Sequence, residues 1–529
     1  MRKNLLFIIC DALTQKNIDF IIANKKTFPG FNKILNNSEI YNNFFSCAPV
    51  TEMVLPSIFS GSYPLDNGGY ENGMKNKKNN FFDILIKNNY DLKIFSASSW
   101  LSNIYNYTNN ENIIENLFSV ENAWQSFQKA YLSHIKKDLS ENTIDEDYVK
   151  QVFTKHFKFF INTIQHDQSF FTKHILKINH KNIGTIVRNI EINLEIFNNH
   201  PKKYLFENLE KMLSKNFAEF FFKSNLNLKI YKKFNKFFWN KKKSVIPNIF
   251  FSKFNLEIRS PSQKYNANVF FDRALSFLKN NSIKPKAVII HFFDIHDRNF
   301  SSHPIIKKFN SSNIHNFNVL KKNFKDDRKF LSLLYVDKLL TKFFEKLEIN
   351  KELVIALTSD HGTTFRGDES SLNSTSLAGS FHDDYINIPF AIFKNEKKKL
   401  INKLGSSVNI LPIILEKLEI KNIKFESKNY SKNLHENDYI ILEHCHRGPC
   451  SRNLKKKIIY HCVRTNKFKY IHKFNIHPKD PSNNIKEVFI NLYKDNLEKF
   501  NLINDHNYYQ NINTMKQIVK KRIEHIFQE

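Results

Sequence analysis

Nearly continuous runs of apolar residues recur along the chain and predict buried β-strands. Four such runs are NLLFIIC (4–10), DLKIFSAS (91–98), KAVIIHFFD (286–294) and ELVIALTSD (352–360). Strands that are apolar on both faces belong in a sheet that helices cover on each side. Between the last two runs, residues 330–347 are apolar at helical spacing, which completes a βαβ unit. The pattern therefore predicts an α/β fold with a mostly parallel central sheet.

Two further regions differ from this pattern. Residues 101–282 are rich in Phe, Lys and Asn and predict a helical insertion with an aromatic core of its own; the alternative is a lid that grips the substrate. After Leu400, short alternating strands such as YIILEH and KIIYHCVRT predict a small C-terminal α+β subdomain. We therefore expect a catalytic α/β domain over residues 1–424 and the subdomain over residues 425–529.

The charge of the chain is strongly positive. The 529 residues include 80 Lys and Arg against 51 Asp and Glu, a formal net charge of +29, which suits an anionic partner. However, Lys, Asn, Ile and Phe are all abundant while Gly and Pro are scarce, the pattern of codon drift in an AT-rich genome. Because no Arg-rich stripe or binding motif accompanies the charge, we expect no nucleic-acid partner.

The cysteines and the N-terminal segment give information on the cellular compartment of the protein. Five cysteines in a chain of this length form no disulfide framework, so we expect reduced thiols. The apolar run LLFII ends directly at Cys10 and Asp11 and is too short for a signal peptide. No apolar stretch has the length of a membrane span. The sequence thus predicts a cytoplasmic protein, and it leaves the oligomeric state open.

Carboxylates follow three of the four predicted strands: Asp11, Asp294 and Asp360. Open α/β sheets bind ligands beyond the carboxyl ends of their strands. His361 follows Asp360 in the motif SDHG, so both can reach one metal ion, with Asp11 as a third ligand. Mixed oxygen and nitrogen ligands favour manganese or zinc over calcium. Such an ion would lower the pKa of a bound hydroxyl and neutralise a phosphate or sulfate oxygen.

Five segments follow one another in an order that is typical of one enzyme group. They are CDAL (10–13), FPGFNKILNNSEIYNNFFSCAPVT (28–51), SVNILPIILEKLEI (407–420), VRTNKFKYIHK (463–473) and FINLYKDNLEKFNL (489–502). In this order they resemble the alkaline phosphatase superfamily, on its sulfatase-like branch. The resemblance covers most of the chain outside the insertion. It implies an alkaline-phosphatase-like sandwich, with a mostly parallel sheet flanked by helices.

The resemblance also implies a nucleophile. In the family it lies ten residues before the Gly of a terminal T/S-G, at or near a helix N-terminus; counted back from Gly61, this position is Thr51. Formylglycine sulfatases have Cys or Ser there, within C-x-P-S-R. Cys47 begins a similar motif, but it lies fourteen residues from Gly61, and Val50 and Thr51 replace the motif's Ser and Arg. We therefore expect Thr51, and not Cys47, to attack the substrate.

A proline complicates the helix expected after Thr51. Pro56 cannot supply the backbone N–H that a continuous helix needs, so the sequence places the helix start nearer Leu55. The alternative role of Thr51 is that of a helix N-cap alone.

HFFDIHDRN (291–299) resembles a family segment whose histidines contact the substrate or protonate the leaving group. It suggests His296 as general acid, since imidazole titrates near neutral pH, and His291 as a substrate contact; the alternative for His291 is a packed strand residue. Two-metal relatives carry D-x-x-x-H here, whereas Arg298 lies four residues after Asp294. This departure favours one divalent ion with Asp294 as an optional further ligand. The expected ligands are Asp11, Thr51, Asp360 and His361.

Two other segments offer candidates. Position 379, where many relatives have Lys or His, is Gly, and His382 in FHDDYINIPF would fill that catalytic role from a shifted place; the alternative is a surface histidine. EHCHRGPC (443–450) places His446 and Arg447 together as substrate-binding residues, since an Arg fork suits an anionic ester. The alternative there is a solvated loop.

The favoured function is a metal-dependent hydrolase or transferase that cleaves phosphate mono- or diesters by in-line attack of Thr51. Threonine cannot become formylglycine, which disfavours a sulfatase; a sulfatase of the same superfamily is the first alternative. The second is a non-catalytic basic polyanion-binding protein on a degenerate fold. The substrate would be an anionic ester on a group such as a sugar or a lipid, whose identity the sequence leaves open.

Overall fold

The structure is a computed structural model in which the arrangement of most of the chain can be described. The described residues are 2–69, 73–108, 110, 112–117, 120–166, 183–221, 267–297, 320, 327–350, 352–363, 379–393, 397–425, 439–446, 458–474 and 487–528.

A central sheet of eight strands carries the site and has the order β5-β4-β6-β1-β7-β8-β2-β9. Neighbours from β5 to β7 are parallel, β8 is antiparallel to both β7 and β2, and β9 is parallel to β2. The four strands expected from the apolar runs are β1, β4, β6 and β7, which confirms the mostly parallel sheet. In sheet order, the strands are β5 (Ile114–Asn116), β4 (Asp91–Ser96), β6 (Lys286–Phe292), β1 (Asn4–Cys10), β7 (Leu353–Thr358), β8 (Phe390–Phe393), β2 (Ser38–Tyr41) and β9 (Lys399–Ile401).

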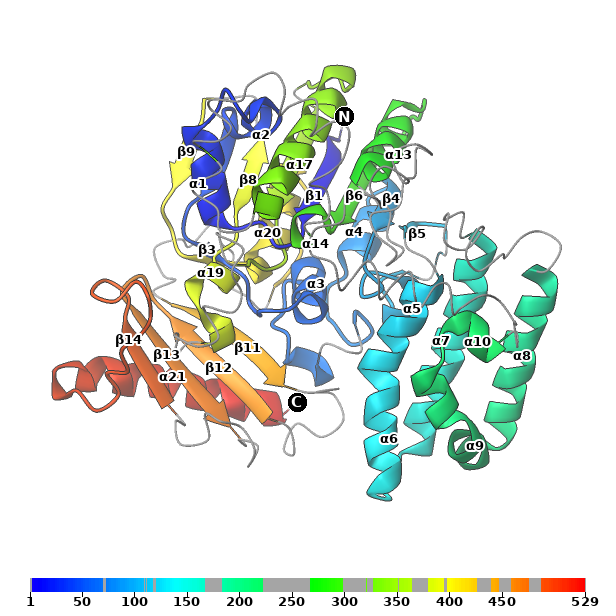
Figure 1. Cartoon of the computed structure of the whole chain (residues 1–529). Helices are drawn as coiled ribbons and strands as arrows, with labels where there is room; N and C mark the ends of the chain where they lie inside the picture. The colour runs from blue at the N-terminus through cyan, green and yellow to red at the C-terminus, as the bar shows by residue number, and fades with distance from the viewer. Residues whose placement is uncertain are drawn as a thin grey trace.

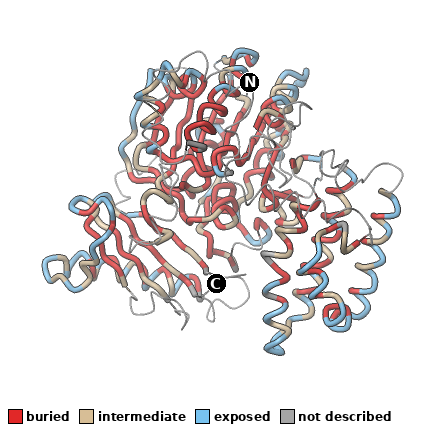
Figure 2. The backbone as a smooth tube through the Cα atoms, viewed as in Figure 1, coloured by how far each residue is buried: buried red, intermediate tan, exposed pale blue. Residues whose placement is uncertain are grey.

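Both faces of this sheet are covered, as the continuous apolar runs require. In β1, alternate side chains point to opposite faces: Leu5, Phe7 and Ile9 belong to one hydrophobic cluster, and Leu6 and Ile8 to the other. Helices cover each face (Figure 1) and nearly all of the sheet is buried (Figure 2). One cluster includes α3 (Thr51–Ser60), α4 (Phe81–Lys87) and α20 (Ile410–Lys417). The other includes α1 (Gln15–Ala23), α2 (Pro29–Leu35), α13 (Ala267–Lys279) and α17 (Asp327–Lys346).

The insertion forms a separate group of helices beside the sheet (Figure 1). Its hydrophobic cluster is largely aromatic, and the ring of Trp124 contacts those of Phe127, Phe160 and Phe220. The predicted aromatic core is therefore confirmed. Although β5 and α13 lie within residues 101–282, they pack with the central sheet. The helices of the insertion are α5 (Val120–Phe127), α6 (Ser133–Ser140), α7 (Glu146–His166), α8 (Ile183–Asn199), α9 (Pro201–Ser214) and α10 (Phe217–Phe221).

A second, antiparallel sheet with a long helix follows near the C-terminus, as expected for an α+β subdomain. Its strands pair in the order β11-β12-β13-β14. One face packs against α21 through residues such as Tyr470 and Met515, and the other contacts Phe45 and Phe381 of the preceding chain. The expected boundary near residue 425 stays a prediction. These elements are β11 (Ile440–His446), β12 (Ile458–Arg464), β13 (Phe468–Phe474), β14 (Glu487–Asn491) and α21 (Tyr509–Gln528).

The prediction that all cysteines are reduced is wrong in one case. Cys445 is disulfide-bonded, whereas Cys10, Cys47 and Cys462 are free and buried. The number of cysteines can indicate a framework of several disulfides, but it does not reveal a single disulfide bond. Disulfides persist mainly in oxidising compartments, so the cytoplasmic location stays an untested prediction. Within the described part of the chain, no helix combines the length and apolarity needed to cross a membrane.

Candidate active site

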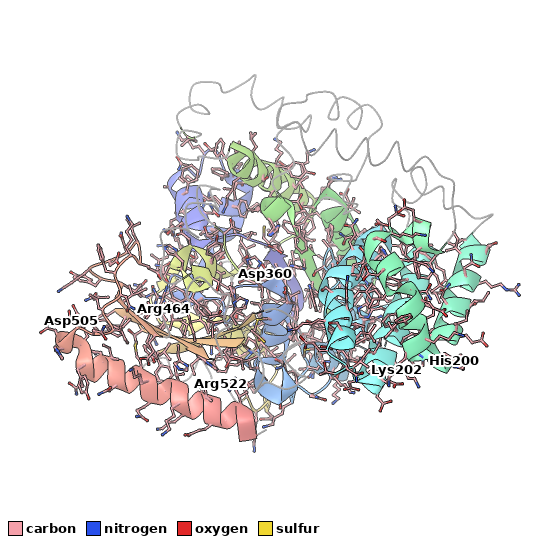
Figure 3. The ribbon with its side chains drawn as sticks, turned by 60° about the horizontal axis from the view of Figure 1, so that its bottom comes forward. His200, Lys202, Asp360, Arg464, Asp505 and Arg522 are labelled. Carbon is pink, nitrogen blue, oxygen red and sulfur yellow. The ribbon has the colours of Figure 1, made fainter. Side chains whose placement is uncertain are left out.

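Three potential metal ligands meet at the carboxyl edge of the central sheet. Asp11 directly follows β1, Asp360 lies two residues beyond β7, and His291 is the last residue but one of β6. Because β1 lies between β6 and β7, their ends bring these side chains together. All three are fully buried, and one ligand atom from each lies within 4.8 Å of the other two. Figure 3 shows Asp360 inside the molecule.

The chemistry of this group fits a divalent cation. His291 Nε2 lies 3.8 Å from Asp11 Oδ2 and 3.9 Å from Asp360 Oδ2. Burial alone would raise the pKa of Asp360, but the neighbouring His361 and His291 outweigh it and hold this pKa below its usual value. Two carboxylates with imidazole nitrogens are the oxygen and nitrogen donors that manganese and zinc bind. The sequence suggested His291 as a substrate contact or a packed strand residue and not as a ligand, because the pairing of β6 beside β1 is not visible in a sequence.

Thr51 and His361 also lie beside these carboxylates. Thr51 Oγ1 is 3.4 Å from Asp11 Oδ2 and 3.3 Å from His361 Nε2. His361 Nε2 is also 3.8 Å from Asp11 Oδ1 and from Asp360 Oδ2. His361 Nδ1 lies 2.9 Å from the carbonyl oxygen of Gly362. Because a carbonyl only accepts, Nδ1 carries a hydrogen, and the other ring nitrogen, Nε2, faces Thr51 and the carboxylates.

Helix α3 begins at Thr51, so the predicted start nearer Leu55 is wrong. The N-cap is Val50 in an extended conformation, and Pro56 lies inside the helix. An interior proline costs about 3 kcal/mol. The helix tolerates this cost because all its residues except Glu52 are buried, and each large apolar side chain contributes about 1.5–3 kcal/mol. Thr51 is thus the first helical residue rather than an N-cap, and the positive end of the helix dipole is next to its hydroxyl.

Cys47 is unsuited to nucleophilic attack. It is fully buried, its backbone N–H donates to Ser407 Oγ (2.9 Å), and burial raises the pKa of its thiol to about 11. A thiol with such a pKa carries almost no thiolate at neutral pH. This supports the distinction drawn from the sequence between Cys47 and Thr51.

His296 lies close to the site and is exposed to solvent. It belongs to the short helix α14 (Asp294–Asp297), and its ring centroid is 6.2 Å from that of His361 and 5.8 Å from that of Phe293. Asp294 instead accepts a hydrogen bond from the backbone N–H of Ala267 at Oδ1 (3.1 Å), and it is not part of the ligand group.

The structure also brings in a lysine that the sequence analysis did not single out. Lys329 is fully buried in α17, and its Nζ donates to Thr363 Oγ1 (2.8 Å), two residues after His361. One lysine within an amphipathic helix gives no signal of burial in the sequence. Its position adds a cation beside the segment that carries the SDHG motif.

His382 lies at the junction with the C-terminal sheet. It caps α19 (Asp383–Ile386), where its Nδ1 accepts from the backbone N–H of Asp384 (3.0 Å), and its Nε2 is 4.0 Å from Glu498 Oε1. Because His382 is only 3% exposed, the alternative of a surface histidine is wrong. Its catalytic role stays a prediction.

The ion pairs beside His382 explain why this junction is ordered. Lys469 is fully buried and its Nζ lies 2.8 Å from Asp383 Oδ1 and 2.7 Å from Glu498 Oε2. Although burial opposes ionisation of Asp383, Lys469 and Arg464 hold its pKa well below the usual value. The remaining two candidates cannot be placed: Arg447 and the side chain of His446 lie outside the described residues, so their substrate-binding roles stay predictions.

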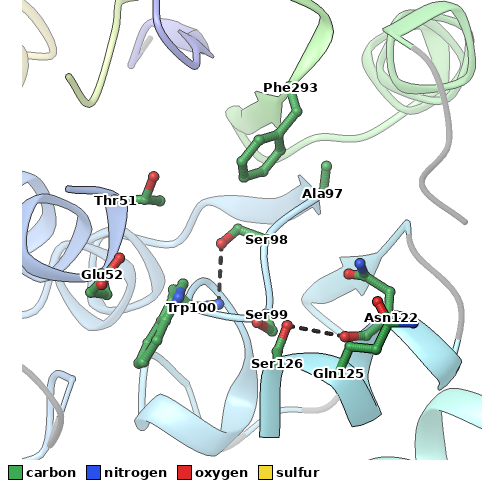
Figure 4. Close-up of a pocket in the computed structure, with 10 residues that line it drawn as sticks. All are labelled: Thr51, Glu52, Ala97, Ser98, Ser99, Trp100, Asn122, Gln125, Ser126 and Phe293. Atoms are coloured by element: carbon green, nitrogen blue, oxygen red, sulfur yellow. Dashed lines mark hydrogen bonds between the residues drawn. The ribbon is translucent and has the colours of Figure 1, made fainter. Parts of the chain in front are cut away.

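A cavity of about 230 Å³ opens beside Thr51. Figure 4 shows Thr51 and Glu52 on one side, the α5 residues Asn122, Gln125 and Ser126 on the other, and Phe293 above them. The insertion therefore contributes to the wall of the same cavity as the candidate nucleophile.

The family model "Sulfatase" matches residues 3–204 and 182–420. The chain belongs to the sulfatase family. This family lies within the alkaline phosphatase superfamily, its members are hydrolases of ester bonds, and it generally uses a divalent metal ion. The recognition made from the sequence, and the expectation of an ester hydrolase, are thus confirmed.

Solved structures share the fold of this sulfatase-family protein at low sequence identity. A putative sulfatase from Bacteroides thetaiotaomicron is 12% identical with a TM-score of 0.52, covering 99% of this chain and 93% of its own. A phosphonate monoester hydrolase of Agrobacterium radiobacter is 12% identical with a TM-score of 0.53, at 99% and 96% coverage. A protein in complex with its substrate D-glucosamine-2-N,6-O-disulfate is 11% identical with a TM-score of 0.53, at 100% and 99% coverage. No curated protein sequence matches the chain.

Proposed function

We propose that this sulfatase-family protein is a metal-dependent hydrolase that cleaves phosphate mono- or diesters through Thr51. The supporting observation is the position of Thr51 Oγ1, 3.4 Å from Asp11 and 3.3 Å from His361, at the edge of a buried group of carboxylates and imidazoles. Asp11 and Asp360 would hold one divalent cation together with Thr51 and His361, and His291 lies within reach as a further ligand. When bound, the cation would lower the pKa of the Thr51 hydroxyl and neutralise charge on the ester.

The first step follows from the groups around Thr51. The hydroxyl points at Asp11 Oδ2, which accepts its proton as Oγ1 forms a bond to phosphorus. The bond from phosphorus to the leaving oxygen breaks on the opposite side, in line with the attack. The N-terminus of α3 faces the oxygen charge that develops, since its first N–H groups have no partner within the helix.

His296 is suited to the proton transfers at the leaving group. It is solvent-exposed and lies beside His361 and Phe293, where imidazolium can protonate the departing alkoxide. In the second step a water, or an acceptor alcohol in a transferase, attacks phosphorus and releases Thr51. The neutral His296 takes the proton of the attacking molecule, and Asp11 returns its proton to Thr51 Oγ1 as the bond from Oγ1 to phosphorus breaks, so all three groups regain their starting states.

The hydroxyl at position 51 is the reason to favour phosphate over sulfate esters. A threonine has a methyl group on Cβ and cannot be oxidised to the aldehyde of formylglycine, whereas its alkoxide can attack phosphorus directly. The fold is compatible with both chemistries, because the structures that share it include sulfatases and a phosphonate monoester hydrolase. The intact cluster of Asp11, His291 and Asp360 argues against a non-catalytic polyanion-binding protein.

A panel of chromogenic esters tests this proposal. The purified protein, supplied with Mn²⁺ or Zn²⁺, is assayed with an aryl phosphate, an aryl phosphodiester, an aryl phosphonate and an aryl sulfate. We expect turnover of phosphorus esters that a chelator abolishes and added metal restores. Turnover of the sulfate alone would assign the protein to the sulfatases proper. Loss of every activity, together with no bound metal, would favour the binding protein.

A further inference from the structure

The cavity beside Thr51 is built jointly by the catalytic domain and the insertion (Figure 4). Ser98, Ser99 and Trp100 come from the segment that follows β4, and Phe293 directly follows β6. The opposite wall is α5, the first helix of the insertion. A group bonded to a phosphorus atom at Thr51 would therefore extend toward α5.

Helix α5 is held firmly enough to shape this wall. One face of it, with Trp124 and Phe127, is buried in the aromatic core of the insertion. Glu121 accepts a hydrogen bond from the backbone N–H of Phe217 (2.8 Å) and another from Gln125 Nε2 (3.2 Å). The face with Asn122, Gln125 and Ser126 is only partly buried and lines the cavity. The amide of Gln125 is thus oriented by its own helix before any substrate arrives.

The polar groups of the cavity offer both donors and acceptors. Ser126 Oγ donates to the carbonyl oxygen of Asn122 (3.0 Å), which leaves its lone pairs as acceptors. Ser98 Oγ accepts from the backbone N–H of Trp100 (3.2 Å), which leaves its own hydrogen as a donor. A ligand hydroxyl both donates and accepts, so such a wall suits several hydroxyl groups at once. Trp100 and Phe293 add flat apolar surfaces against which a ring can stack.

The charge of the residues that line the cavity disfavours anionic ligands. Among the described residues, those that line the cavity include the carboxyl of Glu52 but neither Lys nor Arg, although the whole chain carries a formal charge of +29. An anionic group placed against the α5 wall would face the carboxyl of Glu52 with no Lys or Arg among the described lining residues to pair with it, which is unfavourable. The volume of about 230 Å³ lies below the range of roughly 300–1,000 Å³ that is usual for larger ligands, so the cavity suits one ring rather than a chain.

We propose that this cavity binds the leaving group and selects one uncharged sugar ring, with α5 of the insertion as the element that determines specificity. This inference rests on the proposed function, because it assumes that the ester lies at Thr51. It makes the substrate a phosphate ester of a neutral monosaccharide unit, and it disfavours uronic acids and sugars that carry further phosphate or sulfate groups.

Two kinds of measurement test the inference. Steady-state kinetics compare a neutral hexose phosphate, the corresponding glucuronic acid phosphate and an aryl phosphate. We expect kcat/KM for the neutral sugar to exceed that for the uronic acid at least tenfold. Saturation-transfer NMR with methyl glucoside and methyl glucuronide reports binding without turnover, and only methyl glucoside should bind. Equal binding of both glycosides, or preference for the charged one, would overturn the inference even if the esterase activity is confirmed.

Variants of α5 locate the effect. In Asn122→Ala and Gln125→Ala we expect KM for the hexose phosphate to rise about tenfold, which corresponds to one lost hydrogen bond, with a smaller rise for the aryl phosphate, whose ring makes no hydrogen bonds to these amides. The control is Lys136→Ala on the exposed face of α6, where Lys136 pairs with Glu210 at the surface. Unchanged KM in both cavity variants would overturn the role of α5. If no ester is cleaved but methyl glucoside still binds and the variants weaken it, the proposed function fails while the sugar site stands.

Discussion

Thr51 Oγ1 lies 3.3 Å from His361 Nε2, although the two residues are 310 positions apart in the chain. The contact exists because the N-terminus of α3 and the carboxyl end of β7 meet at one edge of the sheet. Asp11, at the end of β1, lies against both residues. The candidate nucleophile and the candidate metal ligands are therefore positioned by separate elements of one core.

Replacing the hydroxyl of Thr51 tests its role directly. Thr51→Ala removes the attacking oxygen, and we expect kcat with an aryl phosphate to fall by at least about 10³-fold, as for other nucleophile deletions. Thr51→Ser keeps the hydroxyl and should retain measurable activity. Equal activity of Thr51→Ala and the parent protein would exclude Thr51 as nucleophile. Circular dichroism checks that both variants are folded.

Metal content distinguishes the two histidines that flank the carboxylates. We expect His361→Ala to lower the bound metal per chain more strongly than His291→Ala, because His361 Nε2 lies beside Thr51 Oγ1 as well as both carboxylates. Elemental analysis of protein dialysed against Mn²⁺ or Zn²⁺ measures this. The control is His506→Ala, a change at an exposed position near the C-terminus. The reverse order would make His291 the principal imidazole ligand.

The C-terminal helix is tied to the catalytic domain by a buried arginine. The Arg522 guanidinium lies 2.6 Å from Asp66 Oδ1 and 2.6 Å from Glu443 Oε1, and both carboxylates are buried as well. Figure 3 labels Arg522 beside the C-terminal strands and α21. Arg522→Met leaves two buried carboxylates without this partner, so we expect a loss of about 3–5 kcal/mol in the free energy of unfolding. Lys516→Met on the same helix removes a half-exposed pair with Glu487 and should cost less than about 1 kcal/mol. Denaturant unfolding compares the two, and equal losses would contradict the prediction.

Stability should fall in acid because of a buried histidine. Burial, with the nearby Arg522 and His472, lowers the pKa of His461 from 6.5 to about 3. Between these two pH values, His461 therefore binds a proton in the unfolded chain but not in the folded chain. The associated stability is complete above pH 6.5 and is lost as the pH falls toward 3, by about 1.4 kcal/mol per unit.

The variant His461→Gln should flatten this dependence between pH 7 and pH 4. The matched control His506→Gln, at an exposed position, should keep the slope of the parent protein. Denaturant midpoints at each pH measure it. An unchanged slope in His461→Gln would show that other groups govern acid unfolding.

Local patterns in the sequence were sufficient for four of the eight strands of the central sheet and for part of the site. Strands buried on both faces need apolar residues at every position, so β1, β6 and β7 were recognisable without their neighbours. The motif order then indicated Asp11, Thr51, Asp360 and His361, which the structure does bring together. Their roles as ligands and nucleophile stay predictions.

Other features depend on contacts that no local pattern records. The start of α3 at Thr51 was missed, because the cost of Pro56 is offset by burial against the rest of the core. His291 was separated from the ligands, since its place beside Asp11 follows from the neighbouring strands β6 and β1. For His382 the sequence left a catalytic role or a surface position open. The structure instead buries it beside Glu498, at the junction with the C-terminal sheet.

The sequence by itself determined four of the strands of the sheet and the family to which the chain belongs, and it indicated Thr51 as the candidate nucleophile. The hydrophobic pattern of a strand and the residues of a motif are properties of short stretches of the chain, so they can be recognised from the sequence alone. Only the tertiary structure decided which side chains surround the carboxylates and that the insertion faces Thr51 across a cavity. Those relationships join residues hundreds of positions apart, and strand order and helix packing alone fix the distances between them.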